Sequence, residues 1–376
     1  MPDLFHEARI RSMRLPNRFV RSATWEGLAT PEGACTDRLL GVIDRLAEGE
    51  VGLIITGHGY VSREGQAGPW QLGYHDDSLL PGLEELVRTA HRHGSRIAAQ
   101  LAHAGARAAA GPSGREAIGP SPVHKDGALV CREMGRPEIE RVVRAFANAA
   151  ARAQRAGFDA VQIHAAHGYL LSQFLSPVMN RRRDEYGGSL ANRSRIVLQV
   201  VRAVREAVGR DYPLLIKLNS EDFMEGGFSV EEMLALSAQL ESEGLDAVEL
   251  SGGTLDDASR HSPSRPGAVA KEKEAYYQGA ARRFKEQVRL PLILVGGIRS
   301  LEVAEQLVAE GVADCIALCR PLICEPDLVK RWRGGDRRAS ACLSDNRCFQ
   351  PAIAGEGLRC LLRVGDPLTP MARARA

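Results

Sequence analysis

The chain has 376 residues, of which 44% are hydrophobic and 26% are charged, and 49 Lys and Arg against 47 Asp and Glu give a formal net charge of +2. That near balance argues against a nucleic-acid partner or a polybasic membrane contact, and no apolar run approaches the roughly 20 residues that span a bilayer. Eight cysteines are too sparse for a disulfide scaffold and the N-terminus has no signal-peptide pattern, so we expect a cytoplasmic protein.

Short apolar runs alternate with amphipathic stretches along most of the chain. The runs predict eight strands, in order Arg18–Thr24, Gly52–Tyr60, Arg96–Gln100, Asp159–His164, Leu214–Asn219, Ala247–Leu250, Leu292–Val295 and Asp314–Leu318. Apolar residues at helical spacing predict helices between them, including Leu80–His93, Ile139–Ala156, Asn192–Val208, Val230–Glu243, Tyr276–Gln287 and Leu301–Glu310. A glycine follows several of these helices and favours a left-handed cap there, namely Gly94, Gly157, Gly244 and Gly311.

Eight strands, each followed by a helix, is the pattern of an α/β protein of the (β/α)8 TIM-barrel class. An open doubly wound sheet would give the same local pattern, but its Gly-x-Gly-x-x-Gly fingerprint does not occur between a strand and a helix. We therefore predict a barrel domain over residues 1–335 and a cysteine-containing C-terminal extension over residues 336–376.

Two stretches interrupt the alternation. Residues 111–137 are rich in Gly and Pro and contain a short apolar run, which predicts a hairpin insertion after the third strand, covering the barrel mouth. Residues 165–191 form a long loop after the fourth strand, and a loop of that length is usually functional. Because the active sites of such barrels lie at the carboxyl ends of the strands, we expect the chemistry there.

The fourth strand runs into His164, His167 and Tyr169. Two imidazoles can donate hydrogen bonds to one carbonyl oxygen and polarise it, and a nearby phenol can act as a general acid. The same spacing also fits a hydrogen-bonded core histidine with a packing tyrosine, or a His-x-x-His metal pair. The spacing alone does not decide between these interpretations.

Two further polar residues stand in apolar strands. Gln100 closes the third strand, and Lys217 lies near the end of the fifth. A lysine within a buried strand needs a partner, because an unpaired buried charge is costly. Lys217 can face an anionic ligand in the barrel mouth, or it can form a structural ion pair, for example with Glu249 on the sixth strand.

The loops after the seventh and eighth strands are the usual phosphate site of such barrels. The seventh strand leads into Gly296 and Gly297, and the eighth leads into Arg320. Glycines let backbone amides approach a phosphate, and an arginine can bind it with two hydrogen bonds. A tight turn before a helix would use the same glycines, but the occurrence of both loops at the expected places favours phosphate.

The run from His164 to Pro177 continues through Asn180, Arg181 and Arg182 to the segment 184–190. This signature strongly resembles that of the old yellow enzyme family of FMN-dependent oxidoreductases, and it is most similar to the branch that contains bacterial 2,4-dienoyl-CoA reductase. The resemblance extends over almost the whole chain, from Leu15 to Cys360.

The resemblance implies a role for each matching residue. His164 and His167 would bind the substrate carbonyl oxygen, and Tyr169 would protonate the α carbon. Gln100 would hydrogen-bond the flavin pyrimidine edge, and Lys217 would stabilise the anionic reduced flavin near N1 and O2. Gly296, Gly297 and Arg320 would hold the FMN phosphate.

The end of the first strand departs from the family pattern. The family often has Pro followed by Thr or Cys there, whereas this chain has Ser22-Ala23-Thr24-Trp25, so Thr24 and Trp25 are both candidates for the flavin contact. Gly57, in the second predicted strand, is also a predicted flavin-binding residue. A glycine usually precedes the phosphate arginine in the family, and here the residue is Cys319.

The C-terminal extension also departs from the family pattern. In the dienoyl-CoA reductase branch, a cysteine cluster after the barrel binds a [4Fe–4S] centre. This chain has Cys342, Cys348 and Cys360, and it offers Asp345 where a further cysteine might stand. An iron–sulfur centre with an aspartate ligand, a zinc site and an empty remnant are all open. That branch also carries FAD- and NADPH-binding domains after the barrel, whereas this chain ends at Ala376, so we expect no internal relay to a second flavin.

These features predict an FMN enzyme that reduces the C=C bond of an α,β-unsaturated carbonyl compound in a ping-pong cycle, with NADH or NADPH as donor. One alternative is an FMN and iron–sulfur reductase supplied by an electron-transfer protein. Another is a flavin-binding barrel without turnover. The sequence allows a homo-oligomer and does not specify the alkene.

Overall fold

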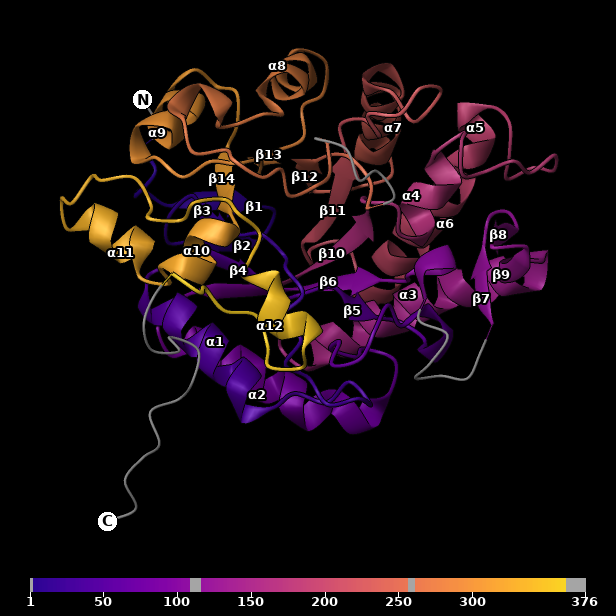
Figure 1. Cartoon of the computed structure of the whole chain (residues 1–376), viewed down its shortest axis with the longest axis horizontal. Helices are drawn as coiled ribbons and strands as arrows, with labels where there is room; N and C mark the ends of the chain where they lie inside the picture. The colour runs from indigo at the N-terminus through magenta and orange to yellow at the C-terminus, as the bar shows by residue number, and fades with distance from the viewer. Residues whose placement is uncertain (1–2, 109–115, 256–260, 363–376) are drawn as a thin grey trace.

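A closed barrel of eight parallel strands forms the centre of the protein (Figure 1). The computed structural model describes residues 3–108, 116–255 and 261–362. Each barrel strand pairs with its neighbours, and the pairing of β10 with β6 closes the ring, which confirms the (β/α)8 prediction. In chain order the strands are β3 (Phe19–Arg21), β4 (Leu53–Ile55), β6 (Arg96–Ala102), β10 (Ala160–Ala165), β11 (Leu214–Asn219), β12 (Ala247–Ser251), β13 (Leu292–Leu294) and β14 (Cys315–Leu318).

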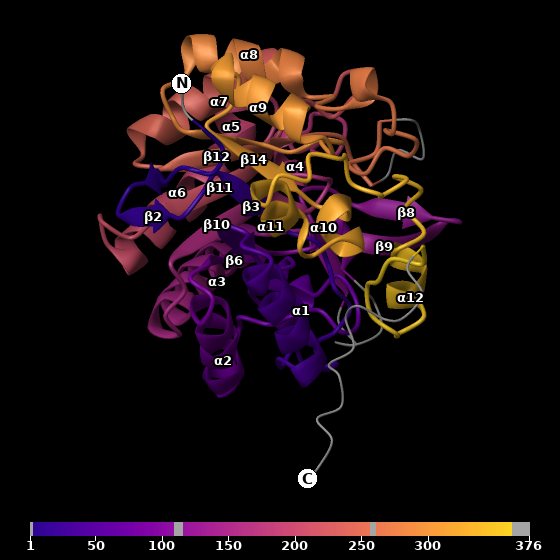
Figure 2. The ribbon, with the colours of Figure 1, turned by 90° about the vertical axis from the view of Figure 1, so that its left-hand side faces the viewer.

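The barrel interior is filled by small and branched side chains at alternate strand positions, as the period-2 geometry of strands requires. An antiparallel hairpin of β1 (Ala8–Ile10) and β2 (Met13–Leu15), which the sequence reading did not predict, packs against one end of this interior. Its apolar side chains join the same buried cluster as the strand residues, so the hairpin closes that end. Figure 2 shows β2 at the end of the barrel opposite β8 and β9.

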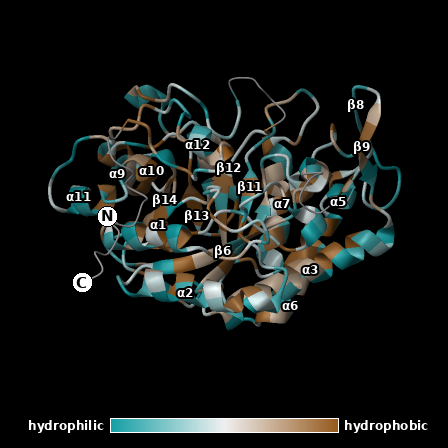
Figure 3. Ribbon diagram, turned by 60° about the horizontal axis from the view of Figure 1, so that its bottom comes forward, coloured by the Kyte–Doolittle hydropathy of each residue, from teal (hydrophilic) through white to brown (hydrophobic). Residues whose placement is uncertain are grey.

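Amphipathic helices cover the outside of the barrel, with α1 and α2 on one side and α8 and α9 on the other (Figure 1). Brown, hydrophobic positions alternate with teal, hydrophilic ones along α3 and α6 (Figure 3). The predicted helices are found within a few residues of their expected bounds, and α1 is additional. The helices are α1 (Asp37–Glu48), α2 (Leu80–His91), α3 (Arg136–Arg155), α6 (Arg195–Val208), α7 (Val230–Ser242), α8 (Gln278–Gln287) and α9 (Leu301–Ala309).

The predicted glycine caps are present, because all four of these glycines have positive φ angles, between +69° and +90°. Among the helices of the described residues, none combines the length and the apolar character needed to cross a membrane.

The second predicted strand is interrupted. Its residues form β4, a break at residues 56–58, and then β5 (Gly59–Tyr60), which pairs with the end of β6. At the break, the Gly57 N–H donates to Glu26 Oε1 (3.2 Å) instead of to a neighbouring strand. A Cβ at Gly57 would lie 2.2 Å from Glu26 Oε2, so the close approach of this carboxylate requires glycine. The break brings His58 to the carboxyl end of the barrel.

The predicted insertion after the third barrel strand is a three-stranded sheet of β7 (Ala117–Gly119), β8 (Val123–Lys125) and β9 (Ala128–Glu133). The expected hairpin is its antiparallel pair β8–β9, and residues 111–115 of the predicted insertion lie outside the described residues. Figure 2 shows β8 and β9 at the same end of the molecule as α12.

After the last barrel strand, the chain forms α10 (Arg320–Cys324), α11 (Leu328–Arg333) and a return segment with α12 (Phe349–Ile353). The return segment is tied to the barrel by backbone hydrogen bonds, from Ser340 N–H to Arg299 O (2.9 Å) and from Leu358 N–H to Glu26 O (2.7 Å). The described part of the predicted extension therefore packs on the barrel, and residues 363–376 lie outside the described residues.

Candidate active site

Three histidines and a tyrosine gather at the carboxyl ends of β10 and β4. The ring centroid of His164 lies 5.2 Å from that of His167 and 4.9 Å from that of Tyr169, so the structure brings together the three residues predicted from the fourth strand. His58, which the sequence reading missed, lies with its ring centroid 5.1 Å from that of Tyr169. In the described residues, no three His, Cys, Asp or Glu side chains are arranged to hold one metal ion.

The backbone after β10 turns sharply to aim these side chains. His167 and Gly168 have φ angles of +64° and +76°, a conformation that needs outside support when a non-glycine residue adopts it. The His167 N–H donates to Asn219 Oδ1 (3.1 Å), and Gln173 Nε2 donates to the Gly168 carbonyl (2.7 Å). The helix α4 (Leu170–Leu175) follows directly. Neighbouring strands and helices thus hold the strained turn in place.

The imidazoles are neutral at physiological pH. Burial, reinforced by the positive charge of Lys217, lowers the pKa of His167 well below its usual value, and burial together with the neighbouring His167 does the same for His164. A neutral imidazole has one N–H donor and one acceptor. Because His164 Nδ1 accepts the Ala166 N–H (3.3 Å), the proton of His164 is on Nε2, where it can be donated to a ligand.

A chain of hydrogen bonds fixes the orientation of the Tyr169 hydroxyl. The Ala67 N–H donates to Gln71 Oε1 (2.7 Å), so the amide nitrogen of Gln71 is the atom that faces His58 Nδ1 (2.8 Å). His58 Nδ1 is then an acceptor, and Nε2 carries the proton toward Tyr169 Oη (3.0 Å). With its oxygen accepting from His58, Tyr169 directs its own proton elsewhere. Burial raises the pKa of Tyr169 to about 12, so the phenol keeps that proton at neutral pH.

A buried polar chain crosses the barrel interior beneath this site. Lys217 Nζ donates to Glu249 Oε1 (3.0 Å) and to Ser22 Oγ (2.7 Å). Gln162 Nε2 donates to the other oxygen of Glu249 (2.8 Å), and Gln100 Nε2 donates to Gln162 Oε1 (2.6 Å). Lys217 therefore forms the ion pair with Glu249, and its contact with an anionic ligand stays a prediction.

The strand register explains why these residues meet. Gln100 lies opposite Gln162, and Lys217 lies opposite Glu249, in directly paired parallel strands. In a closed barrel, equivalent positions on neighbouring strands point to the same interior layer. The chain of polar groups is thus a layer of the barrel core.

The end of the first strand is closely tied to its surroundings. Thr24 Oγ1 donates to the Ser22 carbonyl (3.2 Å) and contacts Cys319 Sγ (2.9 Å). The indole N–H of Trp25 is buried and has no hydrogen-bond partner within the described residues. Gly57 does not offer its N–H to a ligand, because Glu26 already accepts it. Of these candidates, Trp25 is the one that carries an unused donor.

The predicted phosphate residues meet at the carboxyl ends of β13 and β14. Gly296 and Gly297 have φ angles of +136° and +73°, and a Cβ at Gly297 would lie 2.7 Å from the Tyr276 ring. Gly297 and Arg320 line one small cavity there. Both hydrogen bonds of the Arg320 guanidinium within the described residues come from Nη1, so Nη2 remains for an anion. A cavity with a glycine turn and an arginine fits the phosphate of FMN.

A family model described as NADH:flavin oxidoreductase / NADH oxidase matches residues 3–337. The chain belongs to this family. Its resemblance to the old yellow enzymes is thereby confirmed, and a solved old yellow enzyme homologue from Zymomonas mobilis matches with a TM-score of 0.75 at 26% identity, over 89% of this chain and 93% of that one.

Two relatives are longer than the chain. An NADH oxidase from Thermoanaerobacter brockii is 36% identical over 92% of the chain and 53% of its own length. A solved complex of 2-naphthoyl-CoA reductase with 2-naphthoyl-CoA matches with a TM-score of 0.88 at 27% identity, over 96% of the chain and 56% of that structure. The chain thus spans about half the length of these two proteins.

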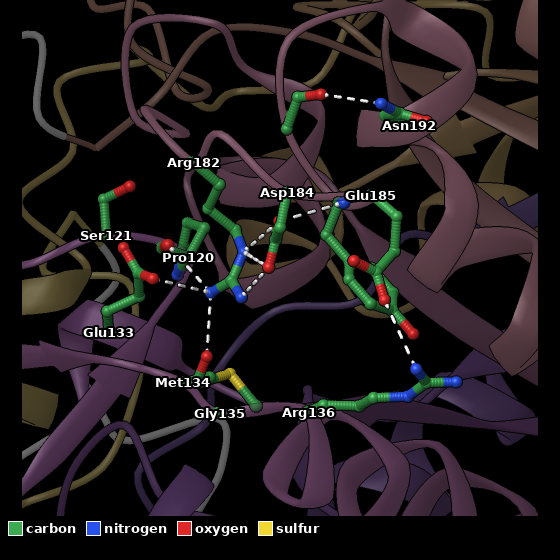
Figure 4. Close-up of polar contacts among 12 residues, drawn as sticks. Pro120, Ser121, Glu133, Met134, Gly135, Arg136, Arg182, Asp184, Glu185 and Asn192 are labelled. Carbon is green, nitrogen blue, oxygen red and sulfur yellow. Dashed lines mark hydrogen bonds and ion pairs between the residues drawn. The ribbon is translucent and has the colours of Figure 1, made fainter.

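This member of the flavin oxidoreductase family has a cavity of about 480 Å³. The cavity lies between the insertion and the long loop after β10, and a buried arginine joins these two segments (Figure 4). Arg182 Nε donates to Asp184 (2.9 Å), and its Nη1 donates to the carbonyls of Met134 (2.8 Å) and Pro120 (3.3 Å). The cavity lining includes Gln173, Met179, Arg107, Arg181, Ser121 and Met224.

The cysteines of the tail lie next to Arg320, at the carboxyl end of β14. Cys342, Cys348 and Cys360 line one cavity together with Cys324 of α10, which the sequence reading missed. All eight cysteines are in the described part of the chain, and all are free thiols. The predicted Asp345 also borders this cavity, but its side chain is exposed and its Oδ1 accepts the Arg347 N–H (3.1 Å).

Proposed function

We propose that the protein is an FMN-dependent reductase of α,β-unsaturated carbonyl compounds that uses NADH or NADPH as donor. The observation that carries this proposal is the group of two neutral histidines and a protonated tyrosine at the carboxyl end of the barrel. FMN, when bound, supplies the chemistry of accepting a hydride from the nicotinamide and giving it to the β carbon of the alkene. The name of the 36%-identical NADH oxidase supports a nicotinamide donor.

His164 and His167 stabilise the negative charge that develops on the carbonyl oxygen. His164 presents Nε2–H, because its Nδ1 accepts the Ala166 N–H. His167 Nε2 lies 2.7 Å from Ser251 Oγ, and if this nitrogen accepts the serine proton, the N–H of His167 is on Nδ1. Two N–H donors held in a buried site are worth more than the same donors in water, because they need no reorganisation as the charge appears.

Tyr169 is the proton donor to the α carbon, and His58 is a positioning residue. The hydrogen bond from His58 Nε2 to Tyr169 Oη (3.0 Å) turns the phenolic proton away from the histidine. A general acid must keep its proton until the transition state, and the raised pKa of Tyr169, about 12, meets that requirement.

The polar layer and the turn at Gly296 and Gly297 supply the residues that would bind the flavin. Lys217 contributes positive charge where the reduced flavin would be negative, and Gln100 lies in the same layer. Gly296, Gly297 and Arg320 would hold the phosphate. Trp25 has an unused N–H near the end of β3, which favours it over Thr24 as the residue at the strand-one position. Location in the cytoplasm and assembly into a homo-oligomer stay predictions from the sequence.

A second candidate is a reductase that receives single electrons from a partner protein through an iron–sulfur centre. The four buried thiols beside the phosphate end favour it. The two candidates share the same FMN site and differ in the donor, so the rate of flavin reduction by NADH and NADPH separates them.

The experiment is an anaerobic measurement of both half-reactions by stopped flow. The protein is loaded with FMN, reduced by NADPH or NADH, and mixed with 2-cyclohexen-1-one, while cyclohexene serves as the matched alkene without a carbonyl. We expect the reduced flavin to be reoxidised by the enone and not by cyclohexene, because only the enone offers an oxygen to the two histidines.

Failure of both nicotinamides to reduce the flavin, with intact reoxidation by the enone after dithionite reduction, would support the second candidate. Failure of a panel of enones to reoxidise the flavin would contradict alkene reduction and favour a flavin-binding barrel without turnover. A protein that does not bind added FMN would contradict the whole proposal.

A further inference from the structure

Four thiols from two separate parts of the chain surround one cavity. Cys342, Cys348 and Cys360 come from the return segment after α11, and Cys324 comes from α10, which follows the last barrel strand directly. The two views in Figures 1 and 2 both place α10 next to α12. The four side chains are between 1% and 9% exposed and form one buried cluster with Ile323, Ala352 and Leu358.

The other candidate ligands near this cavity are engaged elsewhere. The carboxylate of Asp345 is exposed and closes a local turn by accepting the Arg347 N–H. Cys319 packs against the same buried cluster, but it is half-buried, it is not among the residues that line the cavity, and its thiol contacts Thr24 Oγ1 (2.9 Å). Cys324 is therefore the residue that adds a fourth buried sulfur to the three cysteines of the tail.

The donor set decides which metal group fits. Four thiolates are the usual ligands of iron–sulfur clusters and of many structural zinc sites. Zinc needs its sulfurs about 2.3 Å from a single ion, and in the described residues no three ligand side chains converge in that way. In a four-iron cluster each thiolate binds a different iron, so the sulfurs stand further apart. Arg320 also lines the cavity, and its charge would offset the negative charge of such a cluster.

We propose that Cys324, Cys342, Cys348 and Cys360 bind an iron–sulfur cluster, with Cys324 supplying the fourth thiolate instead of Asp345. The site lies outside the catalytic group around Tyr169 and does not depend on the proposed alkene reduction, because metal binding is measured without turnover.

The loop between two of these ligands is tied to the phosphate end of the barrel. Arg320 Nη1 donates to the Ser344 carbonyl (3.1 Å) and to Asn346 Oδ1 (2.9 Å), and the Ser344 N–H points at Cys342 Sγ (3.4 Å). A cluster that orders this loop would also hold Arg320 in place. We therefore expect FMN to dissociate more slowly from the cluster-loaded protein than from the metal-free protein.

The test is anaerobic reconstitution of the full chain with ferrous iron and sulfide, followed by iron and acid-labile sulfide analysis and visible absorption. We expect wild type to take up about four irons and four sulfides per chain, as a [4Fe–4S] cluster requires. Asp345→Ala should keep this content, and Cys324→Ser should lose most of it. Cys35→Ser, which removes a half-buried thiol elsewhere, is the control for loss of a cysteine.

Cys324→Ala gives the same test without a buried hydroxyl if the serine variant does not fold, and circular dichroism checks the fold of each variant. A Cys324 variant that folds and keeps the wild-type iron content would overturn the proposal. So would a wild-type protein that takes up no iron, or one that binds one zinc per chain and excludes iron. Loss of iron in Asp345→Ala but not in Cys324→Ser would assign the fourth ligand to Asp345.

Discussion

The side-chain cluster around Tyr169 and the cavity of the four cysteines lie at the same end of the barrel, but their polar groups are held in different ways. In the cluster around Tyr169, His58, His164 and His167 each have a hydrogen-bond partner from the protein. In the cysteine cavity, the donors are thiols, which form only weak hydrogen bonds. The cluster around Tyr169 is therefore complete as a folded structure, whereas four buried thiols gain most from a bound metal group.

The largest effect is expected from Tyr169→Phe, which removes the acid and keeps the ring that packs against His58 and His164. Reoxidation of the reduced flavin by 2-cyclohexen-1-one should slow by about 10²–10⁴-fold, the usual contribution of a positioned general acid. Reduction of the flavin by NADPH transfers no proton from Tyr169 and should keep its wild-type rate. Stopped-flow measurement of the two half-reactions checks both expectations, and equal slowing of both would point to damaged flavin binding.

The buried polar layer that contains Lys217 and Glu249 should lose stability when one of its charges is removed. Glu249→Gln leaves Lys217 buried without its counter-ion, and breaking a buried pair in this way usually costs about 3–5 kcal/mol of unfolding free energy. The pair is almost inaccessible, since the Lys217 and Glu249 side chains are 3% and 0% exposed. Denaturant unfolding of the metal-free, flavin-free protein measures the loss.

A matched control for this charge lies on the surface. Glu302 pairs with Lys271, and the two side chains are 70% and 52% exposed, so Glu302→Gln should change the unfolding free energy by at most about 1 kcal/mol. Similar values for the two variants would mean that the Lys217–Glu249 pair is not a stabilising part of the core. Cys324→Ala, measured in the same metal-free state, should not change the contribution of the Lys217–Glu249 pair to the unfolding free energy.

The pattern of the sequence was sufficient for the barrel and for most of its polar side chains. Strand and helix periodicity gave the order of elements, and glycines marked helix ends where the left-handed conformation was needed. His164, His167 and Tyr169, at the end of β10 and just after it, were found because they are close in the sequence. The hairpin of β1 and β2 was missed because two strands of three residues each are too short to show a clear alternation.

His58 and Cys324 were missed for a different reason, because each acquires its role through contacts with distant residues. His58 lies at the barrel end where the second strand breaks, next to Gly57, whose N–H donates to Glu26 Oε1. The two glycines that flank His58 were the available signal, since glycine inside a strand often marks a break. Cys324 carries no local signal at all. It reaches the other cysteines because the return segment folds back over α10.

The smallest effect expected is a loss of stability in acid that comes from His58. Burial lowers the pKa of His58 to about 4 in the folded protein, whereas an unfolded chain has histidine pKa values near 6.5. Between those values the unfolded state binds more protons, so the free energy of unfolding should fall as the pH drops from about 6.5 to 4, and His58 adds no further loss below that. His58→Phe should reduce the fall in unfolding free energy over this pH range by on the order of 2 kcal/mol.

His6→Gln, which changes an exposed side chain, should leave the pH dependence of the unfolding free energy unchanged. Unfolding measured at several pH values distinguishes the two variants, and a wild-type slope in His58→Phe would mean that His58 is not held neutral by its burial.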